Sequence, residues 1–135
     1  MLARAVRFYR HGGPDVLRLE QVDVPDPGPE EIRIRISAFG LNRSEARVRE
    51  GWHPFKPEFP SRLGYEAVGL IESIGANVEG FSPGDAVSTL PVVTLNKQGA
   101  YAELFTVPAS VVVHSPPELC MAETAALWSS YITAY

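Results

Sequence analysis

One stretch decides the fold: Gly64-Tyr65-Glu66-Ala67-Val68-Gly69-Leu70-Ile71-Glu72-Ser73-Ile74-Gly75. Its apolar residues favour a β-strand, but three glycines interrupt the pattern. Glycine inside a strand usually marks a bulge, a tight bend or a close approach of two backbones. Glu66 lies in the apolar part of the stretch, where an unpaired carboxylate would be costly to bury. We therefore predict a bent strand in which Glu66 has a structural role, bonded to backbone or to a nearby side chain.

The segments on both sides of this stretch also favour β-structure. Regular alternation of apolar and polar residues is typical of a strand with one buried face, and residues 31–36 show it most cleanly. Their isoleucines are expected to face the core, with Arg33 and Arg35 facing solvent. Further strands are predicted over residues 3–9, 16–24, 99–108 and 111–113, and a turn at residues 81–87 leads into another.

Two segments are predicted to be helical. Residues 42–50 have helical spacing, with Asn42 or Ser44 as a candidate N-cap. Residues 119–135 form the second predicted helix, whose N-terminal end carries Glu118 and Glu123, a favourable placement for the helix dipole. The last part of this helix is strongly apolar and needs a surface against which it can be buried. Because it ends without a Gly cap, a basic last turn or a proline, we expect the chain to be cut there or to be one piece of a larger assembly.

Composition restricts the class of protein. The chain has 135 residues, enough for one domain with a core, and a net charge of −4 without a basic stripe, which argues against a nucleic-acid partner. Arg43, Arg47 and Arg49 are interrupted by Glu45 and Glu50, so a solvated helix face is favoured over a phosphate site. No secretory signal or membrane-length apolar segment is present, so we expect a cytoplasmic protein without a membrane partner.

The single cysteine, Cys120, rules out a disulfide within the chain and a zinc site built from several thiolates. Cys120 lies in an apolar stretch beside Met121, so a small core residue is favoured over a nucleophile. Residues 51–60 form a loop rich in proline that also contains Trp52, His53, Phe55 and Phe59. Such a loop usually folds over something, either a ligand or the protein's own core, and both readings stay open.

The Gly-x-Glu-x-x-Gly pattern of residues 64–69 resembles the signature of the medium-chain dehydrogenase/reductase superfamily, in its GroES-like catalytic domain. Residues 83–87, 99–103 and 133–135 match the family in the same order, so the resemblance covers essentially the whole chain. It implies a mainly β fold, a GroES-like partly open β-barrel with short helices, over residues 1–120. Residues 121–135 would begin an apolar helix that leads into a Rossmann domain. Because no Gly-x-Gly-x-x-Gly pattern occurs, that domain is missing from this sequence.

The resemblance also implies that the protein has no metal. Zinc enzymes of the superfamily carry a His directly before the signature Glu and a Cys early in the helix near Asn42. This chain has Tyr65 at the first position, no Cys at the second, and no four-Cys structural lobe. The chain therefore resembles the zinc-independent branch of quinone oxidoreductases and enoyl reductases, which use NADPH.

Four residues gain expected roles from the resemblance. Asn42 and Thr133 match residues that bind the nicotinamide end of the cofactor, whereas His53 and Tyr65 are the candidate catalytic hydrogen-bond donors. Each has a structural alternative: Asn42 as an N-cap, Thr133 as a hydroxyl bonded to the preceding turn, His53 as an ordinary loop residue, and Tyr65 as a filler of the space left by the metal.

The sequence is compatible with three functions. The leading one is the N-terminal catalytic-domain portion of a zinc-independent, NADPH-dependent oxidoreductase that reduces small-molecule quinones or enones. Such an enzyme would be a homo-oligomer when full length, and the isolated chain would be inactive. The alternatives are a stand-alone GroES-like binding or assembly module without catalysis, and a zinc alcohol dehydrogenase domain.

Overall fold

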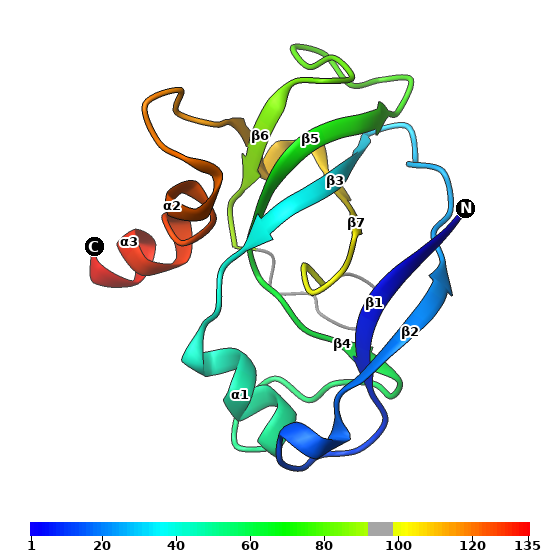
Figure 1. Cartoon of the computed structure of the whole chain (residues 1–135), viewed down its shortest axis with the longest axis vertical. Helices are drawn as coiled ribbons and strands as arrows, with labels where there is room; N and C mark the ends of the chain where they lie inside the picture. The colour runs from blue at the N-terminus through cyan, green and yellow to red at the C-terminus, as the bar shows by residue number, and fades with distance from the viewer. Residues whose placement is uncertain (92–98) are drawn as a thin grey trace.

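The computed structural model describes residues 1–91 and 99–135, which form two β-sheets with short helices (Figure 1). The strands are β1 (Leu2–Phe8), β2 (Arg18–Asp23), β3 (Glu31–Phe39), β4 (Ser61–Arg62), β5 (Ala67–Ile74), β6 (Ala86–Thr89), β7 (Leu104–Pro108) and β8 (Val112–His114). The helices are α1 (Arg43–Glu50), α2 (Met121–Ala125) and α3 (Trp128–Ala134), with 3-10 turns at Pro14–Val16 and Ala109–Val111. The helices of the described residues are at most eight residues long, far too short to cross a bilayer.

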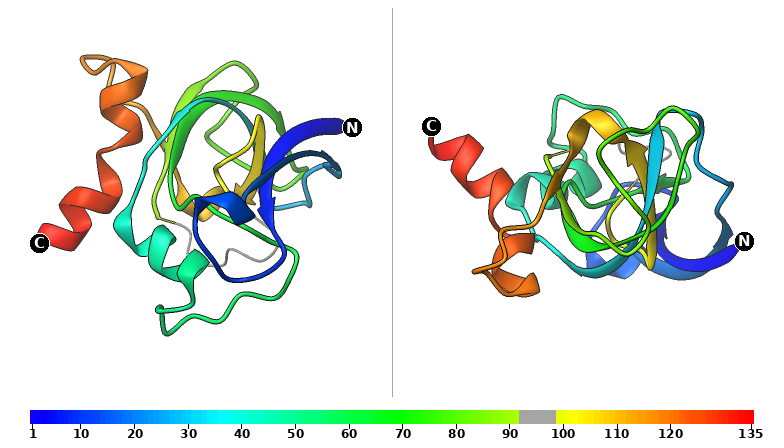
Figure 2. Two further views of the ribbon diagram at one scale, coloured as in Figure 1. Left: turned by 60° about the horizontal axis from the view of Figure 1, so that its bottom comes forward. Right: turned by 90° about the horizontal axis from the view of Figure 1, so that it is seen from above.

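The two sheets are antiparallel and do not close into a barrel. One has the order β7-β3-β5-β6-β8 and the other the order β2-β1-β4. They meet at an isolated bridge between Ala5 and Ala102, flanked by a backbone hydrogen bond of 2.8 Å from Val6 N to Tyr101 O. In Figures 1 and 2, β1 of the smaller sheet lies beside β7 of the larger sheet. The predicted mainly β, GroES-like and partly open architecture is confirmed.

The glycine-rich stretch bends as its sequence predicts. β5 pairs with β3, and the register between them shifts twice, at Arg33/Ile34 and at Ile36/Ala38. Gly69 lies opposite Ile36, where a Cβ would collide with the backbone carbonyl of Arg35. Gly64, just before the strand, has φ of +108°, a conformation that side chains disfavour. The bend places Tyr65 and Glu66 between β4 and β5, at one end of the larger sheet.

The core follows the alternation of β3. Ile32 and Ile34 are fully buried and pack with Phe105 of β7. The prediction that Arg33 faces solvent is wrong, because its side chain is buried and its Nε donates to Glu72 Oε2 at 2.6 Å. The carboxylate across the sheet makes this burial tolerable, and the sequence pattern of one strand does not show it. Arg49 is also buried, and its Nη1 donates to the carbonyl oxygen of Gly12. The predicted solvated face of α1 is therefore wrong at Arg49.

The prediction of a single helix over residues 119–135 is wrong, because the structure has two helices there. α2 ends at Ala125 and α3 begins at Trp128, with Ala126 and Leu127 between them. α2 packs on β3 and β5, whereas α3 lies at the edge of the molecule (Figures 1 and 2). The prediction of a buried Cys120 is also wrong: it is the exposed N-cap residue of α2, on the surface segment that connects β8 to that helix.

Candidate functional site

A cavity of about 530 Å³ lies between α1, the aromatic loop and α3. Its walls are mostly apolar, and the polar side chains among its described lining residues are hydroxyls and one imidazole. Its lining contains three of the four site residues that the sequence predicts: His53, Tyr65 and Thr133. The described residues that line it are Ser44, His53, Phe55, Tyr65, Pro91, Ser129, Ile132 and Thr133. A mostly apolar cavity with a few convergent polar groups is typical of a small-molecule site.

Tyr65 is the most deeply buried of the predicted donors, with 6% of its surface exposed. Burial raises the pKa of the Tyr65 hydroxyl, and the nearby charge of Glu45 acts in the same direction. A side-chain hydrogen bond with Ser44 opposes this rise in pKa. The hydroxyl therefore stays protonated at neutral pH and is able to donate a hydrogen bond inside the cavity.

His53 is half-buried in the aromatic loop, and its ring is oriented by the backbone. The backbone N–H of Phe55 donates to His53 Nδ1 at 3.1 Å. Because a backbone N–H is always a donor, Nδ1 must be the acceptor, and the proton of the neutral ring lies on Nε2. His53 is thus set up to donate from Nε2.

Thr133 lines the cavity while its hydroxyl makes the local bond that the alternative reading predicts. Its Oγ1 donates to the carbonyl oxygen of Ser129, one turn earlier in α3, at 2.6 Å. The proton of this hydroxyl is therefore engaged, and the oxygen remains available as an acceptor.

Asn42 is the one predicted site residue that does not line this cavity. It is the N-cap of α1, and its side-chain Nδ2 donates to Glu66 Oε1 at 3.2 Å. It borders a neighbouring hollow of about 320 Å³ instead, together with Leu41, Arg43 and Tyr101. The structure supports the capping role of Asn42, and its role in cofactor binding stays a prediction.

Glu66 has the structural role expected of it. Only 2% of its surface is exposed, and both carboxylate oxygens accept hydrogen bonds. Oε1 accepts from Asn42, and Oε2 accepts from the backbone N–H of Ser129 at 2.8 Å, within the first turn of α3. A carboxylate at this point satisfies a free backbone donor and complements the helix dipole. Glu66 therefore joins the start of α1 to the start of α3, the two helices that border the cavity.

Ser44, Phe55, Ser129 and Ile132 also line the cavity, although the sequence analysis gave them no site role. The aromatic composition of residues 51–60 was the available signal for Phe55. The sequence contains no such signal for Ser129 and Ile132, because their position depends on the break between α2 and α3.

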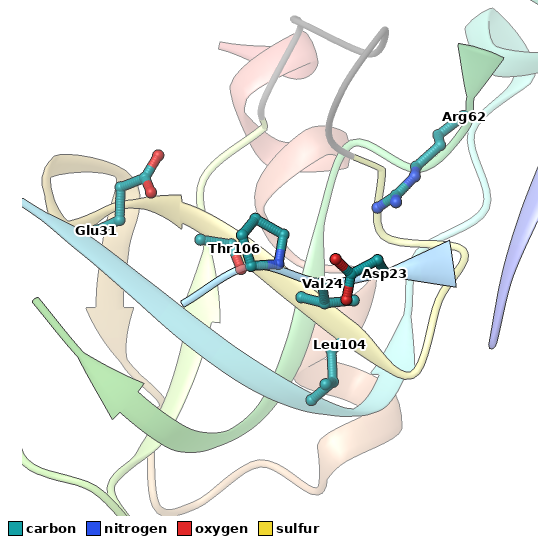
Figure 3. A pocket seen from close by; sticks show the side chains of 7 residues that line it. Asp23, Val24, Glu31, Arg62, Leu104 and Thr106 are labelled. Atoms are coloured by element: carbon teal, nitrogen blue, oxygen red, sulfur yellow. The ribbon is translucent and has the colours of Figure 1, made fainter. Parts of the chain in front are cut away.

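A smaller hollow of about 150 Å³ lies elsewhere on the molecule, and Figure 3 shows the side chains that line it. It shares no residue with the cavity around Tyr65. Burial lowers the pKa of Arg62 there, and the nearby charge of Arg7 lowers it further. Its volume is too small for a nicotinamide ring with a substrate beside it, so we assign the candidate active site to the larger cavity.

The donor set of the larger cavity does not fit zinc. Among the described residues that line it, His53 is the only His, Cys, Asp or Glu. Within residues 1–91 and 99–135, no group of three such residues is placed to hold a metal ion. The same walls do suit a flat, largely apolar ring with one polar substituent, such as nicotinamide. The described residues of these walls include no Lys or Arg, so they fit only the ring end of a dinucleotide and offer no cation to its phosphates.

Comparison with known proteins agrees with this fold. Residues 28–117 match the alcohol dehydrogenase GroES-like domain. The quinone oxidoreductase of Lama guanicoe is 37% identical over 99% of this chain, which spans 40% of that relative. The structure of Escherichia coli quinone oxidoreductase complexed with NADPH superposes with a TM-score of 0.88 at 28% identity, covering 98% of this chain and 39% of that one. An NAD-dependent alcohol dehydrogenase gives a TM-score of 0.91 at 32% identity, covering 97% and 45% of the two chains.

The chain belongs to the alcohol dehydrogenase GroES-like domain family of the medium-chain dehydrogenase/reductase superfamily. Several of the relatives and solved structures that it matches along nearly its whole length are quinone oxidoreductases. It spans about 40% of the length of the curated relatives named quinone oxidoreductase.

Proposed function

We propose that this chain is the GroES-like catalytic part of a zinc-independent, NADPH-dependent oxidoreductase that reduces quinones or enones. The observation that carries the proposal is the cavity that joins His53, Tyr65 and Thr133 from three separate segments. The quinone oxidoreductase relatives, one of them solved with NADPH, support the choice of substrate class and cofactor. The match to an alcohol dehydrogenase makes a zinc enzyme the alternative hypothesis. The donor set of the cavity argues against that alternative.

In such an enzyme, the reduced nicotinamide supplies a hydride to carbon. The substrate oxygen then gains negative charge, and the chain must provide a donor for it. Tyr65 O–H and His53 Nε2–H are the two candidates, and both belong to side chains of the cavity wall. Removal of a donor aimed at developing charge typically costs about 10²- to 10³-fold in rate.

The remaining lining residues position the reactants and exclude water. Phe55 and Ile132 supply apolar walls for a flat ring, which raises the strength of each hydrogen bond inside. Thr133 Oγ1 is left as an acceptor by its bond to the Ser129 carbonyl, and it suits the N–H group of a carboxamide. These features support a nicotinamide ring and a carbonyl substrate as the occupants of the cavity.

The proposal predicts that the chain alone does not oxidise NADPH in the presence of quinones or enones. The described residues of the cavity include no Lys or Arg for the phosphates of NADPH, and near-attack geometry depends on a firmly held cofactor. The test is NADPH oxidation with a panel of small quinones and enones, and calorimetry with NADPH. Turnover or micromolar NADPH binding by the chain alone would show that the cavity is not a partial site.

A longer protein that continues this chain into a Rossmann domain should bind NADPH and turn over one of these substrates. We further propose that this protein is cytoplasmic and homo-oligomeric. Light scattering gives its mass directly, and a monomer at micromolar concentration would contradict the oligomer.

A further inference from the structure

Glu45 is a second buried carboxylate beside the cavity, with only 1% of its surface exposed. It lies in the first turn of α1, and each of its oxygens accepts a hydrogen bond. Oε1 accepts from the backbone N–H of Tyr65 at 2.8 Å. Oε2 accepts from the hydroxyl of Tyr101 at 2.7 Å and from the backbone N–H of Asn42 at 2.9 Å. Three donors from separate parts of the chain therefore fix one carboxylate.

Helix capping does not explain this arrangement by itself. Glu123 has the same position in α2, where its carboxylate accepts from the backbone N–H of Cys120 at 2.9 Å. Glu123 is exposed and, within residues 1–91 and 99–135, accepts no hydrogen bond from a tyrosine, so capping alone needs no burial. The bonds of Glu45 to Tyr65 and Tyr101 go beyond what capping requires.

Burial of this carboxylate is costly, and the fold tolerates it. Burial raises the pKa of Glu45, and the charge of Glu66 raises it further, while the bonds from Tyr101, Asn42 and Tyr65 oppose the rise. Within the described residues, no Lys or Arg forms an ion pair with Glu45. A hydrophobic residue would avoid this cost.

We propose that Glu45 is a positioning residue that holds Tyr65 in the cavity. It clamps the backbone of Tyr65 to the first turn of α1, which also carries Ser44, the hydrogen-bond partner of the Tyr65 side chain. Tyr101 holds the carboxylate through its other oxygen, Oε2. The catalytic consequence rests on the function proposed above, in which Tyr65 is a donor, but the clamp itself does not.

The clamp is tested directly by amide hydrogen exchange of this chain, measured residue by residue by NMR. Glu45→Gln retains the size of the side chain but removes its charge and leaves one acceptor oxygen for three donors. The bond to the Tyr65 amide is thereby weakened or lost, so this amide should exchange at least about 10-fold faster. Tyr101→Phe leaves the carboxylate in place and should give a smaller change in the same direction. Glu123→Gln is the matched control, and it should leave the Tyr65 amide unchanged. Unchanged exchange at Tyr65 in both test variants would overturn the proposal.

The catalytic consequence is tested by a double-mutant cycle in the longer enzyme. Glu45→Gln should lower kcat about 10- to 100-fold when Tyr65 is present, because a small displacement of a reacting group has an effect of that size. In the Tyr65→Phe background, the same change should lower kcat less than about 2-fold. Equal losses in the two backgrounds would show that Glu45 acts only on stability and would overturn the positioning role. An inactive wild-type enzyme would instead contradict the proposed function, and amide exchange would then decide the clamp alone.

Discussion

Removal of the Glu66 carboxylate should loosen α3 and lower the stability of the whole chain. Glu66→Ala leaves two donors without their partner: the Asn42 side chain and the backbone N–H of Ser129. A hydrogen bond to a charged group contributes about 1.5–3 kcal/mol, and the bond to Ser129 is the shorter of the two at 2.8 Å. Burying the Glu66 carboxylate, which is 2% exposed, costs desolvation free energy. The mutation removes this cost, which offsets part of the loss. We expect a net decrease of about 2–4 kcal/mol in the free energy of unfolding, or about 10 °C in Tm.

The assay is urea denaturation followed by circular dichroism, with amide exchange at Ser129 as a local probe. Glu66→Gln keeps an acceptor and the shape of the side chain but loses the charge, so its loss should be intermediate. Glu79→Ala, at an exposed position, is the matched control and should leave stability within about 0.5 kcal/mol. A loss below about 1 kcal/mol for Glu66→Ala, with unchanged exchange at Ser129, would refute the claim that Glu66 joins the two helices.

Three further predictions concern charge, metal and the thiol. Hydrogen bonding to Arg33 lowers the pKa of Glu72, so this pair stabilises the fold above the ordinary glutamate pKa and the contribution is lost as pH falls through the lowered value. Glu72→Gln should therefore reduce the acid dependence of Tm below about pH 4, and an unchanged acid slope would contradict the pair. Elemental analysis of the purified chain should find less than about 0.1 zinc per chain. About one zinc per chain would instead support the hypothesis of a zinc alcohol dehydrogenase domain. Cys120 should react with a thiol reagent as rapidly in the folded chain as in urea, and strong protection in the folded chain would contradict its exposed position.

The fold could be predicted because its main constraints are local. The glycines at 64 and 69 mark a left-handed residue and a close backbone approach, and each is needed at one specific point. The alternation of residues 31–36 also gave the right buried isoleucines. These features depend only on backbone sterics and on the period of a strand, so they are visible in one sequence.

What could not be predicted depends on partners far away in sequence. Arg33 is buried because Glu72 lies across the sheet, and the two are 39 residues apart. The break after α2 places Ser129 against Glu66, which is 63 residues away. Helical periodicity alone favours one continuous helix there, because it contains no information about such a carboxylate.

The candidate site shows the same division. His53, Tyr65 and Thr133 could be named from a resemblance to known enzymes, and the structure gathers them around one cavity. Asn42 was grouped with them, but its amide is directed to Glu66 by the capping geometry of α1. The role of Glu45 could not be foreseen, because both tyrosines that surround it come from distant segments.

The central claim is that this cavity wall carries the hydrogen-bond donor for reduction of a quinone or an enone. The most direct measurement is kcat for NADPH-dependent reduction by the longer enzyme, compared between the wild type, Tyr65→Phe and His53→Ala. We predict that at least one of the two variants loses about 10²-fold in kcat with its fold intact, as expected for a donor used in the transition state. Rates within about 2-fold of the wild type for both variants would contradict the account.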